Sequence, residues 1–192
     1  IYFDELDKIS DTPKGEEIIG ILTHLTDTSQ NSEYHDKYFS DISFDLSKCL
    51  FIFSYNDESK VNPILRDRMY RIQTKGYDMK EKMIIARDYL MPKIREQVSM
   101  TAEEVIIPDE TLQHIISNEG LTFKEDGVRN LKRCLEIIHT KLNLYRIIDS
   151  DNKMFDDMKM KVEFPFTVTT EYVDTMIKHN DRMNPSLFGL YI

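Results

Sequence analysis

The chain opens with an apolar stretch that runs directly into two acids, Ile1-Tyr2-Phe3-Asp4-Glu5. A signal peptide would carry a basic flank and a longer apolar stretch, so this opening is not one. We interpret Ile1 as the middle of a buried strand and expect the sequence to be a fragment of a longer protein. Paired acids after such a strand favour an α/β fold, because open α/β sheets bind ligands at the carboxyl ends of their strands.

The first 75 residues alternate between strand and helix signals. Pro13 suits the first turn of a helix, and apolar residues at near-helical spacing predict a helix over residues 13–26. Consecutive apolar residues over 49–55 predict a strand that is covered on both faces. A short helix is expected over 62–67 and a further strand over 69–73. This order predicts a mainly parallel α/β sheet.

Helical signals dominate after Gly76. Asp78 followed by Glu81 has the form of a capping box and predicts a helix through Gln97, bent or split at Pro92. Other elements are predicted from periodicity and caps: strands over 105–107 and 166–168, helices over 109–118 (stopped by Gly120), 124–148 and 170–178, and a charged linker over 149–159.

Composition excludes several classes of protein. The 192 residues carry a net charge of −9 and give a pI near 5.1, which argues against a protein that coats nucleic acid. The longest apolar run, residues 49–53, is a fraction of the roughly 20 residues that a membrane span needs. Cys49 and Cys134 are far apart and form no disulfide framework. We expect a soluble, globular, intracellular protein in a reducing compartment.

Polar residues follow two of the predicted strands. In nucleotide hydrolases, the first acid after such a strand holds Mg²⁺ through water, and the second can polarise an attacking water. Asp4 and Glu5 have this form, although such a pair also occurs by chance at helix starts. Asn56 follows the strand over 49–55, where an amide can hold the attacking water. Asn-Asp is equally ordinary turn chemistry.

Three arginines are candidates for binding phosphate. Arg66 and Arg68 lie at the end of a predicted short helix, and Arg129 lies near the start of a long one. Arginine's fixed charge and planar fork suit the stabilisation of phosphoryl-transfer charge. The alternative for the first two is a surface pair with Asp67, and for Arg129 a solvated side chain.

The order and spacing of these motifs closely resemble the AAA+ module of Lon-type ATP-dependent proteases. The resemblance covers about residues 1–180. It rests on motifs that occur in one series: Asp4-Glu5-Leu6-Asp7-Lys8, the run from Tyr38 to Ser47, Ser54-Tyr55-Asn56, Leu65-Arg66-Asp67-Arg68-Met69, Gly76-Tyr77 with Glu81-Lys82, Gly127-Val128-Arg129-Asn130-Leu131, and Phe166-Thr167-Val168-Thr169.

The resemblance implies a fold, cofactors and partners. Residues 1–75 would form the C-terminal part of a AAA+ P-loop NTPase parallel sheet, residues 76–180 a mostly helical lid, and residues 181–192 a tail. The cofactors would be ATP and Mg²⁺, and the partners would be polypeptide substrates and other copies of the protein in a hexameric ring. The implied roles are Asp4 as the Walker B acid for Mg²⁺, Glu5 as the acid that activates water, Asn56 as sensor 1, Arg68 as the arginine finger, and Arg129 as sensor 2.

A polar loop rich in aromatic residues falls where Lon proteins have a pore-facing insertion. It spans residues 31–41 and contains Tyr34, Tyr38 and Phe39. It is part of a polar loop over residues 27–41 that is longer than typical connections, and such loops are usually functional or mobile. The resemblance implies contact with polypeptide in a central pore, and the alternative is that these aromatic residues pack on the base of their own loop.

The sequence departs from the family pattern in two respects. Arg66 stands where Lon proteins usually have an apolar residue, which leaves open whether Arg66 or Arg68 is the finger. The sequence also contains no Gly-x-x-x-x-Gly-Lys-Ser/Thr loop and no Ser-Lys peptidase dyad. We therefore expect the segment alone to be inactive. Two alternatives to an ATP-dependent protease stay open: a non-proteolytic remodelling ATPase and a degenerate binding scaffold.

Overall fold

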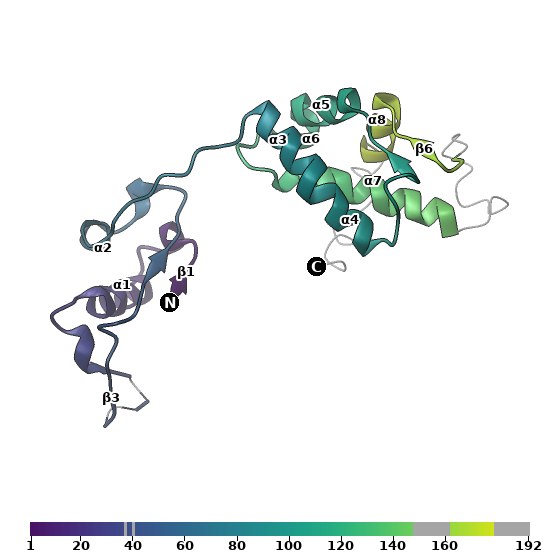
Figure 1. The fold of residues 1–192 in the computed structure, drawn as a ribbon. Coiled ribbons are helices and arrows are strands. Elements are labelled where there is room, and N and C mark those ends of the chain that lie inside the picture. Colours follow the sequence, from purple (N-terminus) through teal and green to yellow (C-terminus); the bar gives the residue numbers. More distant parts are fainter. Residues whose placement is uncertain (37, 40, 148–161, 179–192) are drawn as a thin grey trace. The chain divides into compact units, whose positions relative to one another are not determined.

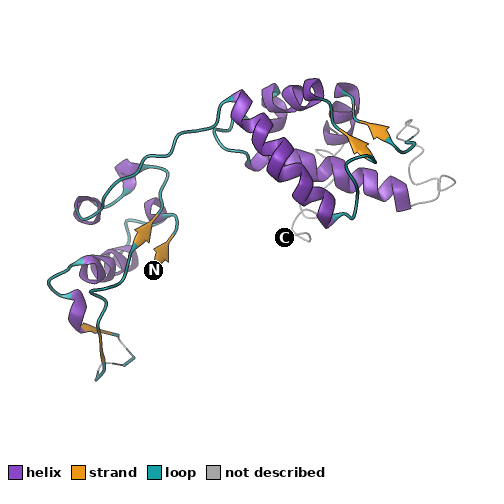
Figure 2. Ribbon diagram, viewed as in Figure 1, coloured by secondary structure: helices purple, strands orange, loops and turns teal. Residues whose placement is uncertain are grey.

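The computed structural model describes residues 1–36, 38–39, 41–147 and 162–178. The predicted linker over 149–159 and the tail over 181–192 lie outside these residues. The chain divides into two compact units, Ile1–Gln73 and Thr74–Ile192 (Figure 1). Helices and short strands are mixed in both, and two of the strand pairs are parallel (Figure 2). The predicted mixture of helix and parallel sheet is therefore confirmed at this coarse level.

The first unit contains a parallel pair of strands. Strand β1 (Tyr2–Phe3) pairs with β4 (Ile52–Phe53), with Tyr2 opposite Ile52 and Phe3 opposite Phe53. The rings of Phe3 and Phe53 stack with centroids 5.3 Å apart. The β1 strand therefore leads directly into Asp4 and Glu5, beside the end of β4.

Helix α1 (Pro13–Thr26) packs its apolar side into a small core, and its bounds are those predicted. The Thr12 hydroxyl accepts a hydrogen bond from the backbone N–H of Gly15 at 3.2 Å. A side chain at Gly15 would collide with the Ser10 carbonyl oxygen, which a Cβ would approach to 1.8 Å. The core itself consists of Leu6, Leu22, Leu25, Val61 and Leu65.

The remaining elements of the first unit are short. Helix α2 (Pro63–Asp67) matches the prediction and is capped by the side chain of Asn62. Strands β2 (Tyr34–His35) and β3 (Ser43–Phe44) form an antiparallel hairpin that was not predicted. Three 3₁₀ turns complete the unit: η1 (Leu6–Lys8), η2 (Asn31–Glu33) and η3 (Glu58–Lys60).

Two of the strand predictions were wrong. The strand expected over 49–55 is reduced to Ile52–Phe53, and Leu50 and Ile52 are 72% and 50% exposed rather than covered on both faces. Residues 69–73 form no strand, and Ile72 is 79% exposed. A strand needs a neighbour for its hydrogen bonds. Within the described residues, β4 pairs with β1 alone, so the sheet has two strands rather than three.

The second unit begins with a helical stretch of three parts. These are α3 (Met79–Ile85), a π-helical turn η4 (Ala86–Leu90) and α4 (Met91–Gln97). The capping box of Asp78 and Glu81 is present, as predicted. The π turn ends two residues before Pro92, which lacks a backbone donor and whose ring crowds the carbonyl four residues earlier, inside the turn. The predicted disturbance at Pro92 is therefore a local widening of the helix.

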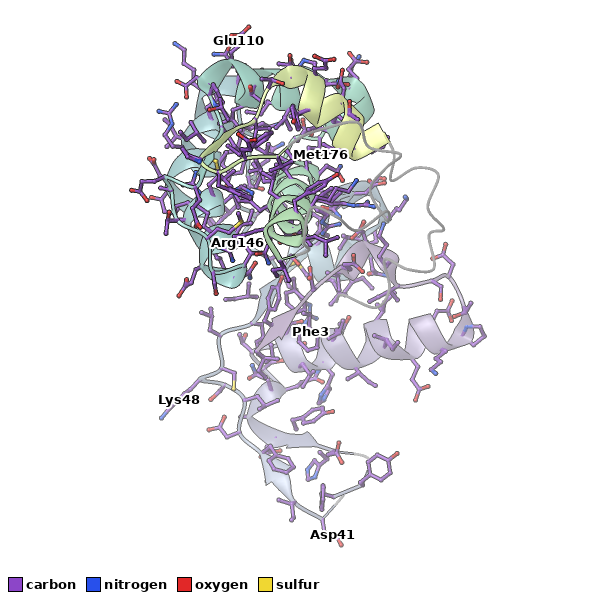
Figure 3. All side chains as sticks on the ribbon, turned by 90° about the vertical axis from the view of Figure 1, so that its right-hand side faces the viewer. Phe3, Asp41, Lys48, Glu110, Arg146 and Met176 are labelled. Atoms are coloured by element: carbon purple, nitrogen blue, oxygen red, sulfur yellow. The ribbon has the colours of Figure 1, made fainter. Side chains whose placement is uncertain are left out.

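Four further helices and a parallel strand pair surround the second core. The helices are α5 (Asp109–Ser117), α6 (Glu119–Thr122), α7 (Arg129–Ile147) and α8 (Thr170–Lys178), and β5 (Val105–Ile106) pairs with β6 (Phe166–Thr167). Helix α7 buries Leu131, Leu135, Ile138 and Leu142, and Met176 of α8 is also buried (Figure 3). Arg146 donates hydrogen bonds to the carbonyls of Val98 and Ser99.

Two helix boundaries in this unit differ from the prediction. Helix α7 begins at Arg129 rather than near Lys124, because Phe123 and Lys124 adopt positive φ angles of 55° and 51°. Gly120 does not stop the preceding helix but lies inside α6. The carbonyl oxygen of the Asn118 side chain accepts the Gly120 N–H at 3.0 Å and starts that short helix.

Candidate functional site

The carboxyl ends of β1 and β4 bring most of the polar candidates of the first unit to one edge. Asp4 and Glu5 follow β1, and Ser54 and Asn56 follow β4. Because the two strands are parallel, their ends lie at the same edge of the pair. This is the part of an open α/β sheet where ligands bind.

The carboxylate of Asp4 is held by two hydrogen bonds to one oxygen. The Ser54 hydroxyl donates to Asp4 Oδ1, and the Glu5 backbone N–H donates to the same oxygen at 2.9 Å. The Ser54 bond, followed by that of Glu5, holds the pKa of the exposed Asp4 carboxyl below its ordinary value. Asp4 is therefore an anion at neutral pH, with a fixed orientation.

Glu5 is exposed and borders an open hollow. Its backbone adopts a left-handed conformation, with φ 56° and ψ 43°, just before the η1 turn. The hollow has a volume of about 380 Å³ and is lined by Asp4, Glu5, Lys8, Ile9, Ser10, Thr12, Lys14, Gly15 and Ile18. Water can therefore reach both acids.

Asp7 is a buried acid that links the two strand ends. Its Oδ1 atom accepts the backbone N–H of Asn56 at 3.4 Å, and Lys8 Nζ lies 3.6 Å from its Oδ2. Removal from water raises the pKa of Asp7, but the hydrogen bond from Asn56 and the charge of Lys8 outweigh it, so the net pKa is lowered. The charged Asp7 thus fixes the backbone at Asn56.

The side chain of Asn56 is exposed, and it is Ser54 that touches Asp4. Sequence reasoning singled out Asn56 and missed Ser54 as a functional residue. The sequence carries no local signal for this contact, because the contact depends on the register of β4 against β1.

Arg68 is bonded within its own unit. Its Nη1 donates to the Thr23 carbonyl at 3.0 Å, and its Nη2 lies 3.2 Å from Asp27 Oδ2. Hydrogen bonds from Ser29, reinforced by Arg68, hold the pKa of Asp27 below its usual range. Arg68 thus contacts the C-terminal end of α1, where a positive charge is favourable.

Arg66 has a looser contact than Arg68. Its Nε lies 4.0 Å from Glu58 Oε1, and Glu58 also pairs with Arg71. The expected alternative, a pair with Asp67, is not among the ion pairs of the described residues. Of these two arginines, Arg68 has the more ordered set of bonds.

Arg129 belongs to the second unit, where it is the exposed first residue of α7. The loop before it is fastened by Glu125, whose carboxylate accepts the backbone N–H groups of Asn130 and Leu131 at 2.8 Å each. Lys82 donates to the Glu125 carbonyl. These bonds satisfy donors at the start of α7 and fix the turn that carries Arg129.

The three aromatic residues of the polar loop have different surroundings. Tyr34 packs against the first core, with its ring centroid 5.9 Å from that of His24. Tyr38 and Phe39 are 88% and 59% exposed beyond the strands of the hairpin. Asp36 Oδ1 accepts the backbone N–H groups of both, at 2.8 and 3.3 Å. The loop thus presents two of the three rings to solvent.

Other kinds of site find no support in the part of the chain that the structure describes. It contains no group of three or more His, Cys, Asp or Glu residues that could hold a metal ion. No helix in these residues has the length and apolar character needed to cross a membrane.

A contact to Mg²⁺ through a bound water needs only one oriented carboxylate, and Asp4 fits that requirement.

Comparison with known proteins identifies the relatives of this chain. No model of a protein family matches it. It is 37% identical over 147 residues to a Lon protease homolog of Acanthamoeba polyphaga mimivirus, which covers 76% of this chain. It is 34% identical over 184 residues to a Lon protease of Mycoplasma mobile, covering 94% of the chain, and 36% identical over 153 residues to a mitochondrial Lon protease homolog of Caenorhabditis elegans, covering 80%.

The matched segment is a small part of each relative. It spans 14% of the mimivirus protein, 15% of the nematode protein and 20% of the Mycoplasma protein. Identity at this level over most of the chain agrees with the resemblance that its motifs carry. Over the residues that align, this chain is similar to one segment of Lon proteases, in agreement with a fragment of a Lon-type AAA+ module.

Proposed function

We propose that this chain is the Walker B-to-lid part of a AAA+ ATPase that hydrolyses ATP to unfold and translocate polypeptides for proteolysis. Residues 1–75 would be the C-terminal half of the nucleotide-binding subdomain, residues 76–180 the lid and residues 181–192 a tail. The observation that carries the proposal is the edge of the β1–β4 pair, where two acids meet the end of a second parallel strand. The similarity to Lon proteases supports it.

Asp4 is proposed to bind Mg²⁺ through water. Its carboxylate is ionised and oriented by Ser54 and by the Glu5 backbone N–H, so it is a suitable partner for metal-bound water. Bound Mg²⁺ would neutralise charge on the phosphates of ATP. Asp4 itself only holds and orients; it takes up no proton.

Glu5 is proposed to act as the general base. Its side chain is exposed beside the hollow, where it can accept the proton of a water that attacks the terminal phosphate. Asn56, whose backbone is fixed by Asp7, would orient that water through its amide. The division of tasks follows from geometry, because Asp4 is tied to β4 and Glu5 is not.

The arginines are proposed to bind phosphate from two directions. Arg68 would be the finger that reaches the nucleotide of a neighbouring subunit in a hexameric ring, and Arg129 would be sensor 2 on the lid. Finger action requires Arg68 to exchange its contact with Asp27 for phosphate, which is an exchange of one anion for another. The more loosely held Arg66 is the alternative finger.

The exposed rings are proposed to contact the polypeptide. Tyr38 and Phe39 are accessible beyond the hairpin strands, whereas Tyr34 packs on the unit's own core.

ATP binding in the family manner would require a phosphate-binding loop that this sequence does not contain. The two free cysteines, Cys49 and Cys134, support a reducing intracellular compartment.

The test is the substitution Glu5→Gln in the full-length protein. We expect ATP turnover to fall by at least about 100-fold, the usual contribution of a general base, while nucleotide affinity is retained. The matched control is Glu17→Gln, which changes an exposed acid on α1 and should leave turnover unchanged. Normal turnover in Glu5→Gln would contradict the proposal and favour the binding scaffold.

A second assay separates the two ATPase alternatives. The full-length protein is incubated with ATP and a fluorescently labelled, unfolded protein substrate. Cleavage that requires ATP supports the ATP-dependent protease. ATP turnover without cleavage would instead support the non-proteolytic remodelling ATPase.

A further inference from the structure

The backbone of Ser54 is hydrogen-bonded to the residue before the two acids and to the residue after them. Its N–H donates to the Phe3 carbonyl at 2.9 Å, and its carbonyl accepts the Leu6 N–H at 3.0 Å. Phe3 and Leu6 are the residues that directly flank Asp4 and Glu5. Ser54 therefore bridges the acid pair and is half-buried against it.

The side chain of Ser54 also contacts Asp4, and on its other side it contacts Tyr2. Its hydroxyl donates its single hydrogen to Asp4 Oδ1. The Tyr2 hydroxyl lies 2.9 Å from Ser54 Oγ, and a hydrogen bond from Tyr2 also contributes to the lowered pKa of Asp4. Tyr2 and Ser54 therefore form a chain of hydrogen-bonding groups that reaches Asp4 from β1 and from the end of β4.

This chain decides which carboxylate oxygen of Asp4 is occupied. Ser54 and the Glu5 N–H converge on Oδ1, and each donor is tied to a strand end. Neither of these two donors bonds Oδ2, so Oδ2 is the oxygen that would hold a metal-bound water. Hydrogen bonds of this kind set the orientation of groups around a metal.

We infer that Ser54 is a positioning residue for metal binding at this edge, acting by holding the Asp4 carboxylate in one orientation. The inference rests on the proposed function, because it concerns the Mg²⁺ that Asp4 would bind through water. It goes beyond that proposal by assigning a role to a serine and by adding Tyr2 as the residue that orients the serine.

The test compares four variants of the full-length protein. Ser54→Ala removes the bond to Asp4, Ser54→Thr keeps the hydroxyl, and Tyr2→Phe removes the hydroxyl that contacts Ser54. The matched control is Ser59→Ala, which removes the same kind of bond, from Ser59 Oγ to Asp57 Oδ1, in the η3 turn.

Two readouts are measured for each variant. The first is Mn²⁺ binding, followed by electron paramagnetic resonance in the presence of a non-hydrolysable ATP analogue. The second is the Mg²⁺ concentration that half-saturates ATP turnover. We expect Ser54→Ala to weaken Mn²⁺ binding and to raise the half-saturating Mg²⁺ concentration by about 10-fold, the lower end of the range for residues around a metal ligand. Turnover at saturating Mg²⁺ should be close to that of the wild type.

The conservative variants sharpen the result. Ser54→Thr and the control Ser59→Ala should match the wild type, and Tyr2→Phe should have a smaller effect than Ser54→Ala. Wild-type Mn²⁺ binding in Ser54→Ala would overturn the inference, as would a loss of turnover that Mg²⁺ does not restore. If Ser54→Ala is normal while Glu5→Gln is inactive, only this inference fails. If Glu5→Gln keeps full turnover, the proposed function fails.

Discussion

The two units of this chain differ in how much apolar side chain they bury. Among the described residues, the core of the second unit contains 19 buried residues, and that of the first contains five. The second unit draws its core from every one of its longer helices, whereas the first has one long helix and a two-stranded pair. Burial of apolar surface is the main favourable term in folding, so the second unit holds most of the chain's stability.

The first unit also exposes apolar residues along its strands. Tyr2, Leu50 and Ile52 are 60%, 72% and 50% exposed. Exposed apolar residues grouped in this way mark an interface or an aggregation hazard. An isolated pair of strands is at best marginally stable in water. The first unit, which carries the candidate acids, is therefore the less stable of the two by itself.

The largest expected effect comes from separating the units. Residues 74–178 expressed alone should be monomeric and melt cooperatively, because their core is complete among the residues described. Residues 1–73 expressed alone should self-associate and show no cooperative melting. Differential scanning calorimetry and sedimentation velocity measure both properties.

A surface substitution provides the control for this experiment. Leu50→Ser removes an exposed apolar side chain, so it should reduce self-association of residues 1–73 without producing a cooperative transition. A monodisperse fragment 1–73 that melts cooperatively would contradict the comparison, and so would a fragment 74–178 that fails to fold.

The helices of both units could be predicted from the sequence because their signals are local. Pro13 and the apolar spacing after it predicted α1 with its observed bounds, and Asp78 with Glu81 predicted the start of α3. The start of α7 was missed because positive φ angles at Phe123 and Lys124 have no sequence signature as strong as glycine.

The strands were predicted less well because their length depends on a distant partner. Strand β4 is paired only where β1 lies beside it, about 50 residues away in the sequence, and β5 pairs with a strand about 60 residues on. For the same reason the sequence pointed to Asp4 and Asn56 at one edge but not to Ser54. The bond of Ser54 to Asp4 follows from strand register, which composition does not encode.

The next largest effect is expected in the core of α7. Leu135 is fully buried, so Leu135→Ala should lower the free energy of unfolding of the second unit by about 3 kcal/mol. Leu144 lies on the same helix but is 42% exposed, and Leu144→Ala should change that free energy by at most about 0.5 kcal/mol. Urea unfolding of residues 74–178 measures both.

Equal effects at Leu135 and Leu144 would show that the helix is not packed as described. The same pair of variants tests whether the units are independent. In the whole chain, Leu135→Ala should shift the transition of the second unit and leave hydrogen exchange in α1 unchanged. Faster hydrogen exchange in α1 as well would show that the two units do not unfold independently.

The smallest effect concerns pH, and it separates the units by which of their titratable groups have shifted pKa values. In the second unit, His139 is fully buried, its Nδ1 donates to the Leu135 carbonyl at 2.8 Å, and its Nε2 has no partner in the described residues. Burial, together with the charge of Arg95, outweighs that hydrogen bond and lowers the pKa of His139. In the first unit the lowered pKa values belong to aspartates: Asp4, Asp7, Asp27, Asp45 and Asp57.

The sign of each effect follows from which state binds the proton. Unfolded His139 takes up a proton near its ordinary pKa of about 6.5, while the folded side chain stays neutral, so stability falls as the pH drops below that value. The slope is at most about 1.4 kcal/mol per pH unit. The aspartates of the first unit are more acidic when folded, so their contribution is lost only below the ordinary aspartate pKa of about 3.9.

The second unit should therefore lose stability between pH 6.5 and 5, in a range where the aspartates of the first unit stay charged. Urea unfolding of residues 74–178 across about pH 5 to 7.5 measures the slope. His139→Leu should flatten it, because the buried titrating group is gone. A slope that persists in His139→Leu would mean that another group takes up the proton, and the contrast in acid sensitivity between the units would then not originate in α7.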